Sequence, residues 1–398
     1  MKASDIVILD YQTTCAAGTG NTALRQAIAQ QQSGLRKNDM VNVELNTWIG
    51  RVPEIDDVQW TEPQVGWKSR NNALIQLALN QGNFMQSIER VKREFSRERV
   101  GLIMGSSTSS IDRAEEAYGQ LEDDQHLPHA FQQEYVLNPH APALYAAHVC
   151  GISGPAITIN TACSSSAKVF ASAARWLNLG LVDAVVVGGA DTLCMSVLYG
   201  FHSLQLVSEK PCKPFDEQRD GINLGEAAGF AILTRKENSP EHTGIKLSGF
   251  GESSDAHHMS HPHPDGLGAK KAIEQALQGA ALTTDDIDYI NLHGTASRAN
   301  DHIEGSLIAN MFSQNTVASS TKGWMGHTLG AAGIIEAIIA LDTLHTSVLP
   351  GTLNLEQVDQ SIGLAMSPHN QQRKVRHVMS NSFGFGGNNC CLLFSNMH

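Results

Sequence analysis

The sequence predicts an α/β fold made of layered sheets and helices. Short apolar runs, such as residues 184–187, alternate along the chain with longer runs of small or amphipathic residues. Apolar runs of strand length that alternate with runs of helix length are typical of layered α/β proteins. Since the short runs are apolar at nearly every position, we expect sheets that are covered on both faces.

The alternation predicts the elements in chain order. Strands are expected at residues 6–9, 100–104, 156–161, 184–187, 229–233 and 287–290. Helices of small residues are expected directly after Cys163 and directly after His327. Because both helices follow a chemically active side chain, the pattern indicates two related halves.

The boundary between the halves is predicted in the polar stretch 235–243, which contains the turn sequence Asn238-Ser239-Pro240. The N-terminal half would then span residues 1–240 and the C-terminal half residues 241–398. Residues 119–129 are charged and rich in turn-forming residues, so we expect an exposed loop there.

Composition excludes some classes of function. The chain has 398 residues and a net charge of −12, from 28 basic and 40 acidic residues, so nucleic acid is not an expected partner. No apolar run approaches the ~20 residues of a membrane-spanning helix. Residues 6–9 are too short, and too closely flanked by aspartates, for a signal peptide. We therefore expect a cytoplasmic protein without a membrane span.

Seven cysteines in a chain of this length, with no CxxC pair, indicate a reducing compartment rather than a disulfide scaffold. Cys15 is expected to be a buried structural thiol, and Cys390 and Cys391 to point to opposite faces of one strand. Cys163 differs from these, because an apolar β-branched run precedes it and a small-residue helix follows it. A thiol at a helix N-terminus is favoured as thiolate, the nucleophile of covalent catalysis.

Two histidines are candidate partners of this thiol. His293 ends a predicted strand just before Gly294, and His327 is flanked by glycines that allow close approach of backbone or ligand. Either histidine could instead be structural, since the chain contains 17 of them. Lys322 would be costly to bury without a carboxylate, for which Glu304 and Asp301 are the candidates.

Two further segments have recognisable chemistry. Residues 380–389 interleave glycines with Phe383 and Phe385, which is suited to gating an apolar pocket or to donating backbone N–H groups to an oxyanion. A glycine-rich turn with aromatic plugs is an equally good interpretation. The charges of residues 214–229 predict a structural ion-pair network around a tight turn.

In this order, the segments resemble the elongating β-ketoacyl-acyl-carrier-protein synthases, the condensing enzymes of the thiolase superfamily with a Cys-His-His site. The resemblance runs from about residue 100 to the C-terminus and includes Thr161-Ala162-Cys163-Ser164-Ser165, His293-Gly294-Thr295 and the glycine loop. It implies a thiolase-like fold with two related halves in five layers, α-β-α-β-α. Residues 156–161 would pair across a two-fold dimer interface.

The resemblance also implies a reaction, the decarboxylative Claisen condensation of an acyl thioester on Cys163 with malonyl-acyl-carrier protein. His293 and His327 would bind the malonyl thioester oxygen, and Lys322, paired with Glu304, would hold the geometry. The backbone N–H groups of Cys163 and Phe385 would form the oxyanion hole. Phe385 would gate the acyl pocket, with Phe383 beside it. Thr295 and Ser297 would hydrogen-bond the pantetheine arm, and Thr108 would border the acyl pocket.

No cofactor is required by this chemistry, because 4'-phosphopantetheine arrives on the carrier protein. Members of the family often hold a structural monovalent cation, Na or K, and the matching positions are Asn291, Glu336, Ser380 and Asn381. The expected partners are an acyl carrier protein and a second subunit, in a homodimer or in a heterodimer with a related ketosynthase-like chain. Candidate docking cations for the acidic carrier are Lys68, Arg70, Lys210 and Lys213.

The sequence departs from the family pattern in places. The first hundred residues fit poorly, Ala296-Ser297-Arg298 replaces a common Ser-Thr-Pro, and Trp324 precedes the second histidine. The added cation at Arg298 is expected to alter how the carrier arm lies. These departures indicate a specialised pathway, such as a polyene or other secondary lipid. The alternatives are a non-elongating chain-length factor, which usually lacks the nucleophile, a thiolase and a cysteine hydrolase.

Overall fold

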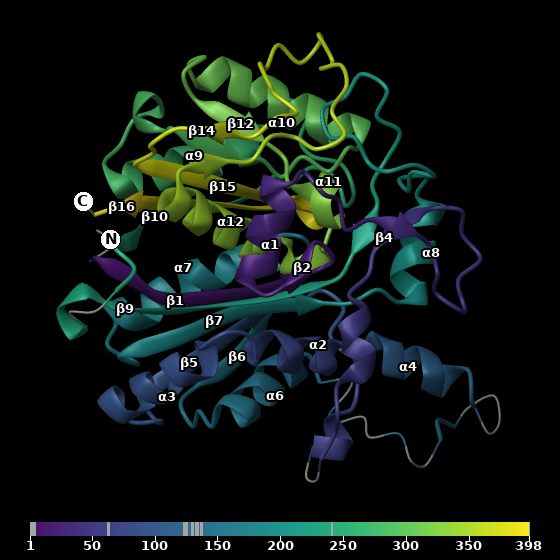
Figure 1. The fold of residues 1–398 in the computed structure, drawn as a ribbon, viewed down its shortest axis with the longest axis vertical. Helices are drawn as coiled ribbons and strands as arrows, with labels where there is room; N and C mark the ends of the chain where they lie inside the picture. The colour runs from purple at the N-terminus through teal and green to yellow at the C-terminus, as the bar shows by residue number, and fades with distance from the viewer. Residues whose placement is uncertain are drawn as a thin grey trace.

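The structure is a computed structural model that describes residues 5–61, 64–121, 126–128, 131, 135, 138–239 and 242–397. Eleven of the described strands form the main sheet, which folds into two sections (Figure 1), and the others form two small sheets of three and two strands. The first section contains β1 (Ile6–Cys15), β5 (Val100–Gly105), β6 (Ala156–Ile159), β7 (Ala184–Asp191) and β9 (Ala227–Arg235). The second contains β10 (Ile245–Ser254), β11 (Tyr289–Asn291), β12 (Val317–Ser319), β15 (His377–Gly384) and β16 (Asn388–Asn396).

The two sections have the same topology. Their orders are β6-β5-β7-β9-β1 and β12-β11-β15-β16-β10, so each strand has a counterpart at the same chain position and the same place in the sheet. In each section the first three strands in this order run parallel to one another. The fourth strand pairs antiparallel with the third, and the fifth pairs antiparallel with the fourth. Antiparallel pairing of β1 with β10 joins the sections. The prediction of two related halves is confirmed by this duplication.

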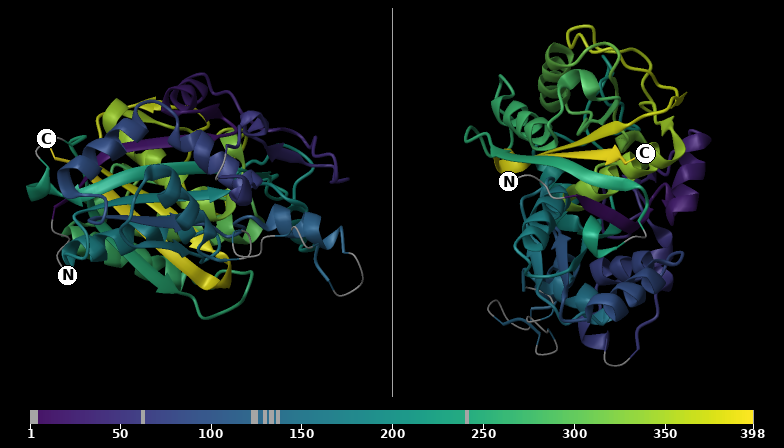
Figure 2. Two further views of the ribbon diagram at one scale, coloured as in Figure 1. Left: turned by 90° about the horizontal axis from the view of Figure 1, so that it is seen from below. Right: turned by 90° about the vertical axis from the view of Figure 1, so that its left-hand side faces the viewer.

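Helices complete five layers, as Figures 1 and 2 show. Helices α7 (Ser165–Asn178) and α12 (Ala332–Thr346) lie between the two sections and contact both. The outer face of the first section is covered by α2 (Arg70–Leu79), α3 (Phe84–Phe95) and α6 (Ala141–Cys150). The outer face of the second is covered by α9 (Leu267–Ala280) and α10 (Arg298–Met311). The predicted α-β-α-β-α arrangement is therefore confirmed.

Shorter elements connect these layers. They are β2 (Gly18–Thr19), α1 (Asn21–Ala29), β3 (Arg36–Lys37), β4 (Trp48–Gly50), α4 (Ile111–Tyr118), α8 (Met195–Ser203), β8 (Leu224–Gly225), α11 (Lys322–Met325), β13 (Val348–Leu349) and β14 (Gln371–Gln372). Single 3₁₀ turns lie at Pro53–Asp57, Gln64–Trp67, Lys236–Asn238, Thr284–Asp286, Leu329–Ala331 and Phe385–Gly387.

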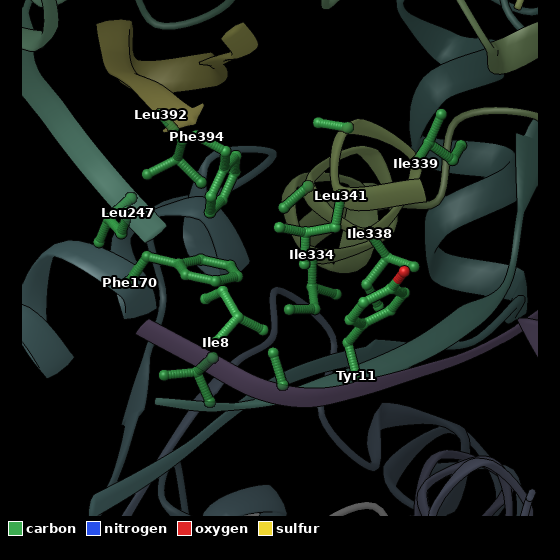
Figure 3. Packing of buried hydrophobic residues seen from close by; sticks show 14 of the residues in the cluster. Ile8, Tyr11, Phe170, Leu247, Ile334, Ile338, Ile339, Leu341, Leu392 and Phe394 are labelled. Carbon is green, nitrogen blue, oxygen red and sulfur yellow. The ribbon is translucent and has the colours of Figure 1, made fainter. Parts of the chain in front are cut away.

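The main hydrophobic core lies between the two sheet sections, around α7 and α12. Figure 3 shows Phe170 of α7 near Ile8 and Phe394, while Ile338 of α12 lies close to Tyr11. A helix that is apolar on all sides must be covered on all sides, and the middle layer provides that cover. The segment Leu329–Thr346 is long and apolar enough to cross a bilayer, but 89% of it is buried here, as expected of a core helix.

The structure has the predicted strands, and their ends differ from the predicted ends by a few residues. The strand expected at residues 156–161 ends at Ile159, and the strand expected from residue 287 begins at Tyr289. Cys390 joins the central core and Cys391 the outer one, so the two thiols point to opposite faces as predicted. The predicted boundary at residues 240 and 241 lies outside the described residues, as does part of the loop expected at 119–129.

Candidate active site

Cys163 lies at a sharp elbow between β6 and α7. The helix begins at Ser165 with Ser164 as its N-cap, so the thiol directly precedes the cap. Ala162 has a positive φ of 51°, a left-handed conformation that is strained for any residue with a Cβ. Two hydrogen bonds hold the elbow, from Thr161 N to Ser165 Oγ at 2.9 Å and from Ser164 Oγ to Thr161 O at 2.9 Å. This strained turn aims Sγ into a cavity.

The structure brings both predicted histidines to this thiol. His327 Nε2 lies 3.0 Å from Cys163 Sγ, and the His293 and His327 rings are 5.3 Å apart at 85°. Ligand atoms of the three side chains all lie within 4.8 Å of one another, and all three residues are buried. The main chain of His327 is held by Asn223, whose carbonyl accepts from His327 N at 2.7 Å. The three reactive groups therefore face one point.

The thiol is not the thiolate that its place near a helix N-terminus predicts. Burial raises the pKa of Cys163 to about 11, and the Phe385 N–H and the Lys322 charge offset this only partly. Burial outweighs the helix dipole here because the dipole contributes only part of a charge, whereas desolvation acts on the whole charge of the thiolate. The thiol therefore needs a base, and His327 is in contact with it.

Both imidazoles are neutral at physiological pH. Burial lowers the pKa of His293 and of His327 well below 6.5, and the positive charge of Lys322 lowers both further. The Nδ1 atoms of both rings lack a hydrogen-bond partner among the described residues. A neutral imidazole can carry its proton on either nitrogen, so each ring can present an N–H to a substrate oxygen.

Lys322 is paired differently from the prediction. Its ammonium donates to Glu336 Oε1 and to the main-chain oxygen of His293, and both ionic side chains are buried. The predicted partner, Glu304, instead accepts from the backbone N–H groups of His293 at 2.9 Å and Gly294 at 2.8 Å. The assignment of Glu304 as the ion-pair partner was wrong because α12, not α10, brings a carboxylate to the lysine.

Glu304 thus supports the first histidine through the backbone. Burial raises the pKa of its carboxyl to about 7, while the two N–H bonds and Asn381 Nδ2, at 3.2 Å, act in the opposite direction. Asp301, the other carboxylate considered for Lys322, accepts from Phe215 N and Ala296 N. Both acids of α10 therefore position backbone around the site rather than neutralise the lysine.

Three of the four residues expected at a monovalent cation lie together. Asn291 and Ser380 are cross-strand neighbours of β11 and β15, and Glu336 of α12 lies next to Ser382, two residues along β15 from Ser380. Asn291 Oδ1, Ser380 Oγ and Glu336 Oε2 are buried without hydrogen-bond partners among the described residues. Oxygen atoms in this state suit a hard cation such as Na⁺ or K⁺. The side chain of Asn381 lies on the opposite face of β15, where it contacts Glu304.

A cavity of about 410 Å³ leads from Cys163 to the surface. The cavity is lined by both predicted histidines and by the residues to which the resemblance assigns the pantetheine arm and the gate, namely Thr295, Ser297, Phe383 and Phe385. Phe385 stacks on Phe201 of α8, with ring centroids 5.6 Å apart. The Phe385–Gly387 turn is docked against residues 255–259 by hydrogen bonds from Gly386 N to Met259 O and from Asp255 N to Gly387 O.

Thr108 does not line this cavity. Its hydroxyl donates to Asp191 Oδ1 at 2.8 Å, and it borders a separate cavity of about 230 Å³ with Thr158 and Asn160. The buried carboxylate of Asp191 binds the threonine, and the role of Thr108 at the acyl pocket stays a prediction.

Asp191 is a residue that the sequence reasoning missed. It ends β7 fully buried and accepts hydrogen bonds from Ser106 Oγ, from the N–H and hydroxyl groups of Ser107 and Thr108, and from Gly330 N. Gly330 follows His327 by three residues, and a Cβ there would lie 2.6 Å from Asp191 Oδ2. The carboxylate thus joins the loop after β5 to the turn after His327. A charged residue ending the apolar run 184–190 was the available signal.

The four basic side chains predicted to dock the carrier protein differ in whether they are already paired with a carboxylate. Arg70 binds Glu226 and Asp56, so its guanidinium is already occupied, and Lys213 pairs with Glu356 at 2.7 Å. Lys68 and Lys210 are exposed. The ion-pair network predicted for residues 214–229 is present, with Arg219 paired to Asp359 at 2.8 Å.

Comparisons with known proteins agree with this geometry. The profile of the β-ketoacyl synthase N-terminal domain matches residues 3–239, and that of the C-terminal domain matches residues 245–356. The 3-oxoacyl-[acyl-carrier-protein] synthase 2 of Vibrio cholerae is 33% identical over 335 residues, 79% of this chain and 80% of that protein. Nodulation protein E of Rhizobium meliloti is 29% identical over 98% of both chains.

A solved structure is similar over almost the whole chain. It is described as a ketosynthase, ApeO, in complex with its chain length factor, ApeC, from Xenorhabdus doucetiae. The match has a TM-score of 0.87 and 36% identity, and it covers 99% of this chain and 98% of the other. The ishigamide ketosynthase/chain length factor shares the fold, with a TM-score of 0.90 at 23% identity. The chain therefore belongs to the β-ketoacyl synthase family, the condensing acyltransferases of the thiolase superfamily.

Proposed function

We propose that this enzyme elongates an acyl chain held on Cys163 by decarboxylative condensation with malonyl-acyl-carrier protein. The observation that carries the proposal is the convergence of Cys163 Sγ and two neutral imidazoles on one cavity. A chain-length factor without a nucleophile is not favoured, because the thiol, both histidines and Lys322 are all in place.

The first half-reaction is acyl transfer to the thiol. As Sγ attacks the incoming thioester, its proton passes to His327 Nε2, 3.0 Å away. The tetrahedral oxyanion would be stabilised by the backbone N–H groups of Cys163 and Phe385, the second of which faces Sγ. Collapse of this intermediate expels the carrier thiol, which takes up the proton, and leaves the acyl group on Cys163.

The second half-reaction forms the carbon–carbon bond. His293 and His327 would donate N–H bonds to the malonyl thioester oxygen and stabilise the enolate that forms when carbon dioxide leaves. The enolate carbon attacks the carbonyl carbon of the Cys163 thioester, the bond between that carbon and Sγ breaks, and the departing thiolate takes up a proton from water to regenerate the thiol. Burial, reinforced by the charge of Lys322, keeps both imidazoles neutral in this half-reaction, so each can donate an N–H to the malonyl oxygen.

A bound Na⁺ or K⁺ is proposed as a structural element. Asn291, Ser380 and Glu336 would hold it with their unpartnered buried oxygens. When bound, the ion would supply positive charge that compensates those oxygens and the Glu336 carboxylate. These side chains orient the ends of β11 and β15, from which His293 and the Phe385 loop extend.

A second subunit is proposed at the edge of the first sheet section. The four residues of β6 are partly exposed, and the only strand paired with β6 among the described residues is β5. An apolar edge strand next to the nucleophile elbow is suited to antiparallel pairing with a related chain. The 36% identity to a chain of a ketosynthase–chain length factor complex supports a heterodimer, with a homodimer as the alternative.

We place the enzyme in a specialised pathway, such as synthesis of a polyene or polyketide chain, and in the cytoplasm. The seven cysteines are all free, which suits a reducing compartment. The test is incubation with malonyl-carrier protein and a panel of acyl primers, read by intact mass. Products two carbons longer than the primer support the function. Primers that load without elongating would overturn it.

A further inference from the structure

The mouth of the catalytic cavity carries one strong cation. Among the described residues that line the cavity, Arg298 is the one lysine or arginine. Its side chain is exposed, and no described carboxylate forms an ion pair with it. Since Cys163 is 6% exposed at the other end, the cavity runs from a buried thiol to an exposed guanidinium.

The acids of the cavity wall are already engaged. Asp220 accepts from Ser208 Oγ at 2.6 Å. Asp255 accepts from Asn389 Nδ2 at 2.8 Å and from His263 N at 3.1 Å. These bonds hold the carboxylates to neighbouring protein groups, which leaves the guanidinium of Arg298 available to an anion from outside.

The main chain around Arg298 is held in place by hydrogen bonds to buried residues. Arg298 begins α10, and its main-chain oxygen accepts from the buried Arg219 at 3.2 Å. Buried Asp301, in the same helix turn, accepts from Phe215 N at 2.8 Å. The main chain that carries the cation is therefore held in place, and only the side chain needs ordering when an anion binds.

The first turn of α10 adds open donors. Its N-cap, Ser297, makes no side-chain cap bond, because its hydroxyl lies 3.0 Å from that of Thr295. Ala299 and Asn300 line the cavity beside Arg298. The uncapped N–H groups and the helix dipole reinforce the positive potential that Arg298 creates.

We propose that Arg298, supported by this helix turn, binds the phosphate group of the 4'-phosphopantetheine arm of the carrier protein. The inference rests on the proposed function, since it takes the arm to be the occupant of the cavity. The arm carries its thioester at one end and its phosphodiester at the other. With the thioester at buried Cys163, the phosphodiester lies at the mouth, where a guanidinium can form two parallel hydrogen bonds to it.

The test compares two ligands that differ only in the phosphate. S-methyl-4'-phosphopantetheine and S-methyl-pantetheine are titrated by calorimetry into the unacylated wild-type enzyme and into Arg298→Ala and Arg298→Lys. The matched control is Arg93→Ala, which removes an exposed arginine of α3 outside the cavity. The thioether ligands cannot transfer an acyl group, so the readout does not depend on turnover.

The wild-type enzyme should bind the phosphorylated ligand about tenfold more tightly, as expected for a charge-assisted hydrogen bond. Arg298→Ala should lose this preference, Arg298→Lys should keep part of it, and the control should keep all of it. The inference is overturned if the wild type has no preference, or if Arg298→Ala keeps it or weakens both ligands equally. Failure of the proposed function is distinct, because it appears as lack of elongation while the phosphate preference persists.

Discussion

Asp191→Asn tests whether a buried carboxylate holds the second histidine in place. The side chain accepts hydrogen bonds from three backbone N–H groups, those of Ser107, Thr108 and Gly330, and from neighbouring hydroxyls. An asparagine keeps the shape but turns one acceptor oxygen into a donor. Serine and threonine hydroxyls can rotate to accept from the new NH₂ group, whereas a backbone N–H cannot.

The cost follows from this difference. Asparagine with NH₂ in place of Oδ2 removes the 2.6 Å hydrogen bond from Gly330 N to the carboxylate and leaves that N–H only its longer bond to Ser107 Oγ, at 3.2 Å. A hydrogen bond to a charged group contributes about 1.5–3 kcal/mol, and weakening of the remaining charge-assisted bonds adds to this loss. We expect a loss of about 2–4 kcal/mol in the free energy of unfolding. The turn after His327 should loosen, and a displacement of about 1 Å at the imidazole can cost about 10²-fold in rate.

The assay pairs denaturant unfolding with two activities, acyl loading of Cys163 and release of carbon dioxide from malonyl-carrier protein. Both activities should fall, since His327 must be aimed at Cys163 Sγ for loading and at the malonyl oxygen for decarboxylation. The control is Asp183→Asn, just before the other end of β7, where a half-exposed pair with Arg99 predicts a loss of at most about 1 kcal/mol. An Asp191→Asn enzyme with wild-type stability and decarboxylation would refute the reasoning.

Three further predictions follow from the site. His327→Ala should slow acyl loading of Cys163 without abolishing it, and should release carbon dioxide at least about 10²-fold more slowly, because the imidazole acts in both half-reactions; undiminished decarboxylation in separate half-reaction assays would contradict this. Lys322→Ala should cost about 3–5 kcal/mol, because it leaves the Glu336 carboxylate buried without its partner. Adding Glu336→Gln should recover part of the loss, whereas additive losses in a double-mutant cycle would exclude coupling. Alkylation of Cys163 by iodoacetamide should rise about tenfold per pH unit from pH 7 towards its pKa of about 11, since only the thiolate reacts; a plateau below pH 8 would contradict the raised pKa.

The fold and the reactive groups were accessible from the sequence because they depend on local patterns. The β-branched run before Cys163 and the small residues after it define a strand, a turn and a helix, and the structure has each of them there. His293 and His327 could be chosen among 17 histidines because glycines and strand ends accompany them. The duplicated strand order confirms that the two halves are related.

The partners of these groups could not be deduced in the same way. Glu304 and Glu336 are both carboxylates on helices near Lys322, and only the packing of α12 between the sheet sections decides that Glu336 pairs with it. Asp191 contacts residues more than eighty positions away in both directions along the chain, so no local pattern indicated its partners. The pKa of Cys163 is a similar case, because burial raises it by more than the helix dipole lowers it.

The most direct test of the account is a single-turnover experiment on one sulfur atom. The enzyme is first loaded from an acyl-carrier protein that the primer panel has identified, and peptide mapping locates the adduct. Malonyl-carrier protein is then added, and the adduct mass and carbon dioxide are followed together. The account predicts an acyl group on Cys163 that disappears as carbon dioxide and the elongated product form in equal amounts. Elongation without that adduct, or by the Cys163→Ala enzyme, would contradict it.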